Sequence, residues 1–373
     1  MPPNPCVETT LPPVADGRTK LWDAPPISRF GTNWVYAGIK CWIVCTRVVY
    51  LGANDRVVTG RSMDWKFEIG TNLWVMPRGV ARTGLAGPDS LSWTSKYGSL
   101  VATGYDICTT DGVNEQGLAA NLLWLVESAY PHVDAGGPGI SLALWAQYVL
   151  DNFATVEETV AALTATPLKV VTAGVPGEDR LATLHLSISD KTGDSAIVEY
   201  IDGRQVIHHS RDYQVMTNSP IFDKQLAINE YWTQIGGVVM LPGTNRAADR
   251  FVRASFYINA IPKTDEPLVA VASVLSVVRN ASVPYGISTA DEPNISSTRW
   301  RSAVDHKDLR YVFESALAPN AFWVDLGNLD FTKTRKLDLG QGEQSVFAGD
   351  ASAHFVEAPP FDFMSVAGTG AGR

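Results

Sequence analysis

Short runs of β-branched and aromatic residues, separated by turn residues, dominate much of the chain. Residues 45–52 and 55–65 are two such runs, and they flank the tripeptide Ala53-Asn54-Asp55. This arrangement predicts a β-hairpin, because Asn and Asp tolerate the backbone geometry of tight turns. The same pattern predicts further strands over residues 71–79, 96–106, 168–173, 183–190, 195–202, 204–210, 213–220, 297–305, 309–315 and 321–327.

Apolar residues at helical spacing predict helices between these groups of strands. Residues 140–155 show this spacing, and residues 155–165 begin with a capping box in which Thr155 stands three positions before Glu158. Three later helices are predicted over residues 221–232, 247–261 and 268–278. By contrast, residues 109–125 predict a turn around Asp111-Gly112 that leads into a buried strand.

Groups of strands alternate with groups of helices instead of forming repeated βαβ units. This order favours an α+β fold with four αββα layers, in which two packed antiparallel sheets are flanked by helices. The proline-rich, non-periodic residues 1–44 are interpreted as a leader or pro-segment. We expect residues 45–350 to form a single catalytic domain and residues 351–373 to form a C-terminal extension with a mobile end.

Composition and charge exclude several classes of function. The chain has 373 residues, a formal net charge of −9 and 45% hydrophobic residues. Nucleic-acid partners are not expected, because the chain has no cluster of Lys and Arg to replace counterions. No metal site or cofactor is expected either, because the four cysteines and six histidines show no metal-ligand spacing.

The sequence gives little information about localisation. No window reaches the roughly 18 uninterrupted apolar residues of a membrane helix. The longest approach, residues 34–44, is short and contains Lys40. The chain as written is expected to be cytoplasmic without a membrane span, or periplasmic or secreted if the true N-terminus differs.

Cys45, Arg61 and Asp64 are candidates for nucleophilic chemistry. Residues 16 and 19 positions after Cys45 return to the start of its strand across a tight hairpin, so Arg61 and Asp64 can lie beside the thiol. A thiol is nucleophilic as thiolate and needs a base near neutral pH. Cleavage of the Val44–Cys45 bond would supply one, because a free α-amine has a pKa of about 7.7 to 8.0.

Four motifs in order resemble those of the choloylglycine hydrolases, an N-terminal-nucleophile hydrolase family of penicillin V acylases and conjugated bile salt hydrolases. The motifs lie in residues 45–65, 111–118, 215–220 and 241–256, and the likeness spans essentially residues 45–350. The short interval between Asn218 and Arg250 is more similar to the Gram-negative branch. Without the resemblance, Cys45 would be interpreted as a small buried core residue.

The resemblance implies a role for each site residue. Cys45 would be the mature N-terminal nucleophile, with Arg61 against its thiolate and Asp64 orienting its amine. Asn218 would donate its side-chain amide to the oxyanion, together with a backbone N–H near Trp124. Arg250 would complete the polar network of the site.

The pocket is expected to have two indole walls, Trp65 and Trp124, which favour flat aromatic or fatty acyl groups. Both could equally be core aromatics.

The resulting hypothesis is a metal-free cysteine amidohydrolase that cleaves linear, non-peptide amide bonds through a thioester after self-cleavage before Cys45. A penicillin V acylase-like activity is the leading interpretation. Conjugated bile salts and N-acyl homoserine lactones are alternative substrates, and a non-catalytic αββα binding module is an alternative of another class. The expected partners are a small-molecule N-acyl amide and, by resemblance, further copies of the chain in a homo-oligomer such as a tetramer.

Overall fold

The computed structural model describes residues 45–132, 136–236, 239–288, 295–340 and 347–366. The expected leader, 1–44, and the end of the expected C-terminal extension, 367–373, lie outside the described residues. All of the described residues belong to the same structural unit of the chain.

The described residues form two large sheets. The first has seven strands, in the order β14 (Val215–Met216), β1 (Thr46–Leu51), β2 (Val57–Trp65), β15 (Ser297–Asp305), β16 (Arg310–Ser315), β17 (Ala321–Asp325) and β19 (Gly349–Asp350). The second has nine, in the order β13 (Arg204–His209), β12 (Ser195–Ile201), β11 (Leu184–Ser189), β8 (Ala119–Trp124), β7 (Cys108–Asn114), β6 (Ser99–Gly104), β3 (Leu73–Met76), β18 (Arg335–Leu337) and β20 (Val356–Glu357). Two small sheets pair β9 (Gly139–Ser141) with β10 (Lys169–Val171) and β4 (Ala81–Thr83) with β5 (Ser92–Thr94).

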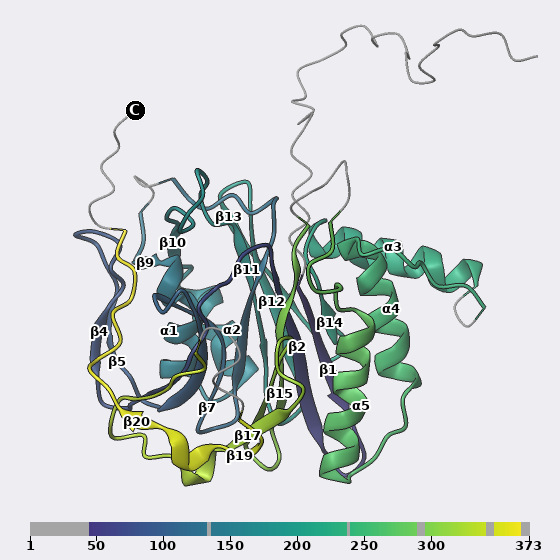
Figure 1. The fold of residues 1–373 in the computed structure, drawn as a ribbon. Helices are drawn as coiled ribbons and strands as arrows, with labels where there is room; N and C mark the ends of the chain where they lie inside the picture. The colour runs from purple at the N-terminus through teal and green to yellow at the C-terminus, as the bar shows by residue number, and fades with distance from the viewer. Residues whose placement is uncertain (1–44, 133–135, 237–238, 289–294, 341–346, 367–373) are drawn as a thin grey trace, which may run out of the picture. The chain divides into compact units, whose positions relative to one another are not determined.

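Helices cover the outer face of each large sheet, so the unit has four layers (Figure 1). The helices are α1 (Trp145–Asn152), α2 (Val156–Ala165), α3 (Phe222–Ile235), α4 (Ala247–Ala260) and α5 (Pro267–Asn280), with short 3₁₀ turns η1 (Leu142–Leu144), η2 (Leu326–Asn328) and η3 (Ser352–His354). Helices α1 and α2 cover the second sheet, whereas α4 and α5 pack on the first. The expected αββα architecture is therefore confirmed.

The β1–β2 hairpin places the start of β1 between the layers. Asn54 and Asp55 have positive φ angles of 49° and 57° at its tip, a geometry that these two residue types tolerate. All nine residues of β2 are buried, because one face meets the second sheet and the other meets α5. Gly60 lets α5 approach, since a Cβ there would lie 2.4 Å from Cγ1 of Val274.

Most predicted elements are confirmed to within a few residues, but two differ. Asp111-Gly112 lies inside β7, not in a turn. The carboxylate of Asp111 is buried and accepts hydrogen bonds from Asn121, Ser302 and Tyr311, so the turn-forming residue is used here for tertiary bonding. The helix predicted from residue 140 begins only at Trp145, after a strand and a 3₁₀ turn.

Candidate active site

Cys45 lies immediately before β1, in the layer between the two sheets. Its side chain borders a cavity, although the residue is only 3% exposed. The backbone N–H of Cys45 donates to Oδ1 of Asn218 at 2.6 Å. Its Sγ lies 3.9 Å from the backbone oxygen of Asp64. The thiol and the nitrogen of the same residue are thus both held at one end of the cavity.

Arg61 reaches the thiol from β2, the strand paired with β1. Its Nη2 lies 3.8 Å from the Sγ of Cys45, and its Nη1 donates to the carbonyl oxygen of Thr110 at 2.6 Å. The indole of Trp300 lies beneath the guanidinium, 5.0 Å from ring centroid to Cζ. Carbonyl bonding and stacking fix the orientation of the cation beside the sulfur.

Burial is the main influence on the pKa of the Cys45 thiol. It raises the pKa of Cys45, the charge of Arg61 acts against this rise, and the charge of Asp64 adds to it. Arg61 therefore does not by itself produce a thiolate at neutral pH. A nucleophilic role for Cys45 consequently needs a base within reach of the sulfur.

Asp64 is fully buried at the end of β2. Its carboxylate accepts a hydrogen bond from Oγ of Ser62 at 3.3 Å and another from the hydroxyl of Thr298. Burial raises the pKa of Asp64 to about 6, and the charge of Arg250 acts in the opposite direction. Ser62 also accepts a bond from the N–H of Thr46 at 3.2 Å, which links Asp64 to the residue that follows Cys45.

Arg250 and Asn218 complete the polar end of the site from α4 and from the loop after β14. Arg250 donates through Nη1 to the carbonyl oxygen of Cys45 at 2.7 Å and through Nη2 to Oδ1 of Asn218 at 2.9 Å. Burial lowers the pKa of Arg250 to about 10, and the charges of Asp64 and Cys45 act against this. Asn218 in turn donates through Nδ2 to the carbonyl oxygen of Trp124 at 2.7 Å.

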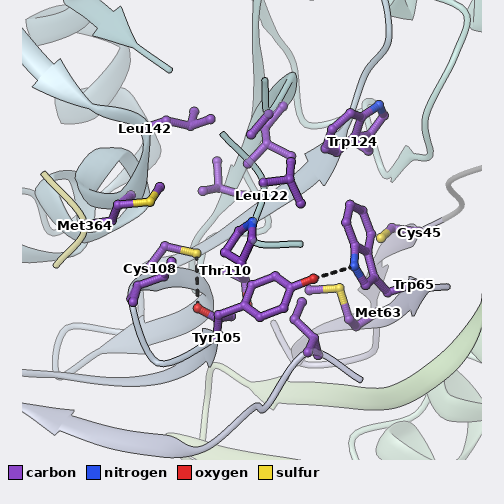
Figure 2. A pocket seen from close by; sticks show the side chains of 18 of the residues that line it. Cys45, Met63, Trp65, Tyr105, Cys108, Thr110, Leu122, Trp124, Leu142 and Met364 are labelled. Carbon is purple, nitrogen blue, oxygen red and sulfur yellow. Dashed lines mark hydrogen bonds between the residues drawn. The ribbon is translucent and has the colours of Figure 1, made fainter. Parts of the chain in front are cut away.

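The other part of the cavity is apolar. Figure 2 shows Cys45, Trp65 and Trp124 at one end, with Met364 and Cys108 at the other. The rings of Trp65 and Trp124 lie 5.5 Å apart with planes inclined by 50°. The remaining lining side chains are mostly aliphatic or thioether groups, among them Met63, Ile69, Ile107, Leu122, Leu142, Val175 and Leu184. Such a surface favours an uncharged, hydrophobic group.

A charged cluster that the sequence did not indicate covers the two indoles. The guanidinium of Arg180 lies 4.3 Å from the ring centroid of Trp124 and 5.7 Å from that of Trp65. Glu178 pairs with Arg180 and also with Lys66, whose Nζ lies 3.1 Å away. No spacing in the sequence signals this contact, because it joins a loop before β11 to the ends of β2 and β8.

Supporting residues also come from strands distant in the sequence. Thr298 and Trp300 lie on β15, which pairs with β2, and they contact Asp64 and Arg61 respectively. Tyr105 accepts a hydrogen bond from Nε1 of Trp65 at 2.8 Å. The sequence did not indicate the roles of Thr298 and Trp300, because they reach the site only through the pairing of β15 with β2, two strands far apart in the chain.

No group of three or more His, Cys, Asp or Glu suited to a metal ion occurs among the residues that the structure describes. Within the same residues, none of the helices is both long and apolar enough to cross a bilayer.

Residues 45–339 match the family described as linear amide C–N hydrolases, choloylglycine hydrolase family. The chain is 57% identical to a penicillin V acylase from Pectobacterium atrosepticum, over 87% of this chain and 93% of that protein. A bile salt hydrolase/transferase from Clostridium perfringens is 28% identical, over 70% of this chain and 86% of its own length. The structure of a penicillin V acylase from Agrobacterium tumefaciens superimposes with a TM-score of 0.80 at 63% identity, covering 86% of this chain and all of that one.

Proposed function

Because this chain belongs to the choloylglycine hydrolase family of linear amide C–N hydrolases, we propose that Cys45 is its nucleophile and that the acyl group of the substrate enters the cavity beside it. One observation carries the proposal. Cys45 borders an apolar cavity, and Arg61, Asn218 and Arg250 all bond to it from separate elements.

The proposed base is the α-amine of Cys45 itself. In the full-length chain this nitrogen is a peptide nitrogen, so it becomes basic only after hydrolysis of the Val44–Cys45 bond. The freed amine then has a pKa close to neutral. It is near the sulfur because both atoms belong to Cys45, joined through Cα and Cβ. Oδ1 of Asn218 accepts from this nitrogen at 2.6 Å, and the Asp64 carboxylate is proposed to hold it in its protonated form.

In the first half of the reaction, the amine takes the thiol proton and the thiolate attacks the acyl carbonyl carbon. The tetrahedral oxyanion accepts hydrogen bonds from Asn218 and from a backbone N–H near Trp124. An amide NH₂ has two N–H groups, so Asn218 can bond both to the carbonyl oxygen of Trp124 and to the oxyanion. Collapse breaks the C–N bond, and the departing amine takes the proton from the α-ammonium.

In the second half, water attacks the thioester that joins the acyl group to Cys45. The α-amine removes a proton from this water, and the same donors hold the second oxyanion. Breakage of the C–S bond releases the acid, and the proton returns to the sulfur. No step of this sequence uses a metal or an organic cofactor.

Penicillin V is the proposed substrate. Two relatives with more than half of their residues identical to this chain are named penicillin V acylases. Its acyl group ends in a phenyl ring, which can pack against indole rings such as those of Trp65 and Trp124. Conjugated bile salts are the second candidate, supported by the 28% identical bile salt hydrolase/transferase. N-acyl homoserine lactones are the third, because their acyl tails are apolar.

Hydrolysis of these three substrates by one preparation tests the proposal. Intact mass before the assay should show loss of residues 1–44 in the wild type. We expect penicillin V to have the highest kcat/KM, and Cys45→Ala to hydrolyse none of the three. Uncut protein without thiol-dependent turnover would support a binding module. Glycocholate cleaved far faster than the others would contradict the role given to the indoles.

Assembly into a homo-oligomer is also proposed. Tyr231 and Ile235 near the end of α3, and Val239 and Met240 beyond it, are large apolar side chains that are 45% or more exposed. Exposed apolar side chains gathered in one region favour a protein interface. Light scattering of the wild type and of a Tyr231→Glu variant tests this, since the variant should dissociate.

A further inference from the structure

The proposed chemistry does not use the far end of the cavity. That end is formed in part by Met364, from the C-terminal part of the described chain. Figure 2 shows Met364 on the side opposite Cys45, with Cys108 and Leu142 close by. A group attached to the sulfur of Cys45 and directed along the cavity would therefore meet Met364 last.

Hydrogen bonds attach Met364 to two segments that line the same cavity. Its backbone N–H donates to the carbonyl oxygen of Ile107 at 2.9 Å. Its own carbonyl oxygen accepts from Oγ of Ser141 at 2.9 Å. Ile107 borders the cavity, and Ser141 directly precedes Leu142, which borders it as well. The backbone that carries Met364 is thus fixed on both sides.

Two phenylalanines anchor the segment just before Met364. The ring of Phe361 packs edge-on against Trp74, with ring centroids 4.9 Å apart, and it lies 4.5 Å from the ring of Phe363. Both belong to the core between the second sheet and its helices, and both are 9% exposed or less. The segment is therefore part of the packed structure, and Met364 has a defined place in it.

We propose that Met364 sets the length of the acyl group that this enzyme accepts. The inference rests on the proposed function, because it assumes that the acyl group fills this cavity. Each methylene that stays buried contributes about 0.8 kcal/mol of transfer free energy, which is about fourfold in binding. An acyl chain gains this factor until its end meets the thioether of Met364, and a longer chain must displace that side chain.

The test measures kcat/KM for a series of amides with one amine and linear acyl groups of increasing length. Met364→Ala removes the three heavy atoms beyond Cβ, so the optimum should move to chains about two or three carbons longer. Met364→Trp should move it to shorter chains and lower the rate for the wild-type optimum by about tenfold or more. Met364→Leu, of similar volume, should retain the wild-type optimum.

Met76→Ala is the matched control. Met76 is a buried methionine in the same core, but it does not border the cavity. Its loss should lower thermal stability and leave the chain-length optimum unchanged. If the Ala and Trp variants of Met364 fold and keep the wild-type optimum, or lose activity equally at all lengths, the inference is wrong although the proposed function stands. If the wild type shows no Cys45-dependent hydrolysis of any amide in the series, the proposed function itself is wrong.

Discussion

The two ends of the cavity differ in the kind of interaction that fixes them. At the end that holds Cys45, charged and polar side chains are buried, and each bonds to carbonyl oxygens or to other members of the site. At the far end, Met364 and Leu142 meet the cavity with apolar atoms. The first end requires specific partners because an unpaired buried charge is costly. The far end only has to leave a space of the right volume for the substrate. Substitutions there should therefore change the choice of substrate more than the rate of the chemical step.

The largest expected effect is a difference in activity between substitutions of Cys45 and Cys108, the two free cysteines among the described residues. Cys45→Ala should abolish hydrolysis, a loss of about a thousandfold or more, because it removes the thiol whose sulfur lies 3.8 Å from Nη2 of Arg61. Cys108→Ala is the matched control. Burial raises the pKa of Cys108 to about 11, so its thiol stays protonated, and activity should persist. Steady-state rates on penicillin V measure both, and equal losses in the two variants would contradict the assignment.

Asn218→Ala should cost about a hundredfold in kcat, because it removes one proposed oxyanion donor. It also removes the acceptor shared by Cys45 and Arg250, so KM alone should not account for the loss. Asn259→Ala, on the exposed side of α4, is the control and should be silent. Steady-state kinetics that give kcat and KM separately test this prediction. If Asn218→Ala changed KM alone, the result would argue against the oxyanion role.

Asp64 should produce an acid limb in the pH profile. The pKa of Asp64 in the folded chain is about 6, raised mainly by burial. If the carboxylate holds the α-ammonium, kcat/KM should fall as pH drops through about 6. Asp64→Asn should be about tenfold or more slower at pH 8 and should lack this limb. If kcat/KM of the variant still fell in the same way at low pH, a titratable group other than Asp64 would be responsible for that fall.

The same shift has a consequence for stability. A raised pKa means that the folded chain keeps a proton that the unfolded chain, with a pKa near 3.9, has already lost. This contribution to stability is complete below about pH 4 and disappears as pH rises through about 6. Asp64→Asn should therefore show a weaker fall of the unfolding free energy over that range. Urea unfolding at pH 4 and pH 7 measures the difference.

In the apolar lining beside Cys45, Trp65→Leu should raise KM for penicillin V by about tenfold and change kcat less. It removes one ring of the indole pair and the bond to Tyr105, while Cys45 keeps its contacts with Arg61, Asn218 and Arg250. Trp323→Leu, on β17 and not bordering the cavity, is the control. An effect mainly on kcat in Trp65→Leu would mean that this indole acts on the chemical step and not mainly on binding.

The smallest effect should come from a residue that contacts neither end. Thr155 accepts a hydrogen bond from the N–H of Glu158 at 3.1 Å, and this cap begins α2. Thr155→Ala should cost about 1 kcal/mol of stability and leave kcat/KM unchanged. Thermal unfolding and activity measured on one sample test both parts, and a loss of activity would mean that the cavity depends on α2.

Much of the fold could be predicted because its signals are local. The hairpin around Asn54, the capping box at Thr155 and the helix that carries Arg250 are set by residues close together in the chain. Asp111-Gly112 misled the prediction, because turn-forming residues also satisfy buried polar contacts when another strand supplies the partners.

The order of the elements, the position of Cys45 at the head of a strand, and the distance along the hairpin to Arg61 and Asp64 all follow from the amino-acid sequence. Packing in three dimensions was needed to show that Trp300 stacks under Arg61, that Arg180 covers the indoles, and that Met364 borders the far end of the cavity. The two groups of features differ because the interactions behind them act over different separations along the chain. Turn geometry and hairpin pairing act between near neighbours in the chain, whereas burial brings together whichever distant segments the packed sheets and helices leave in contact.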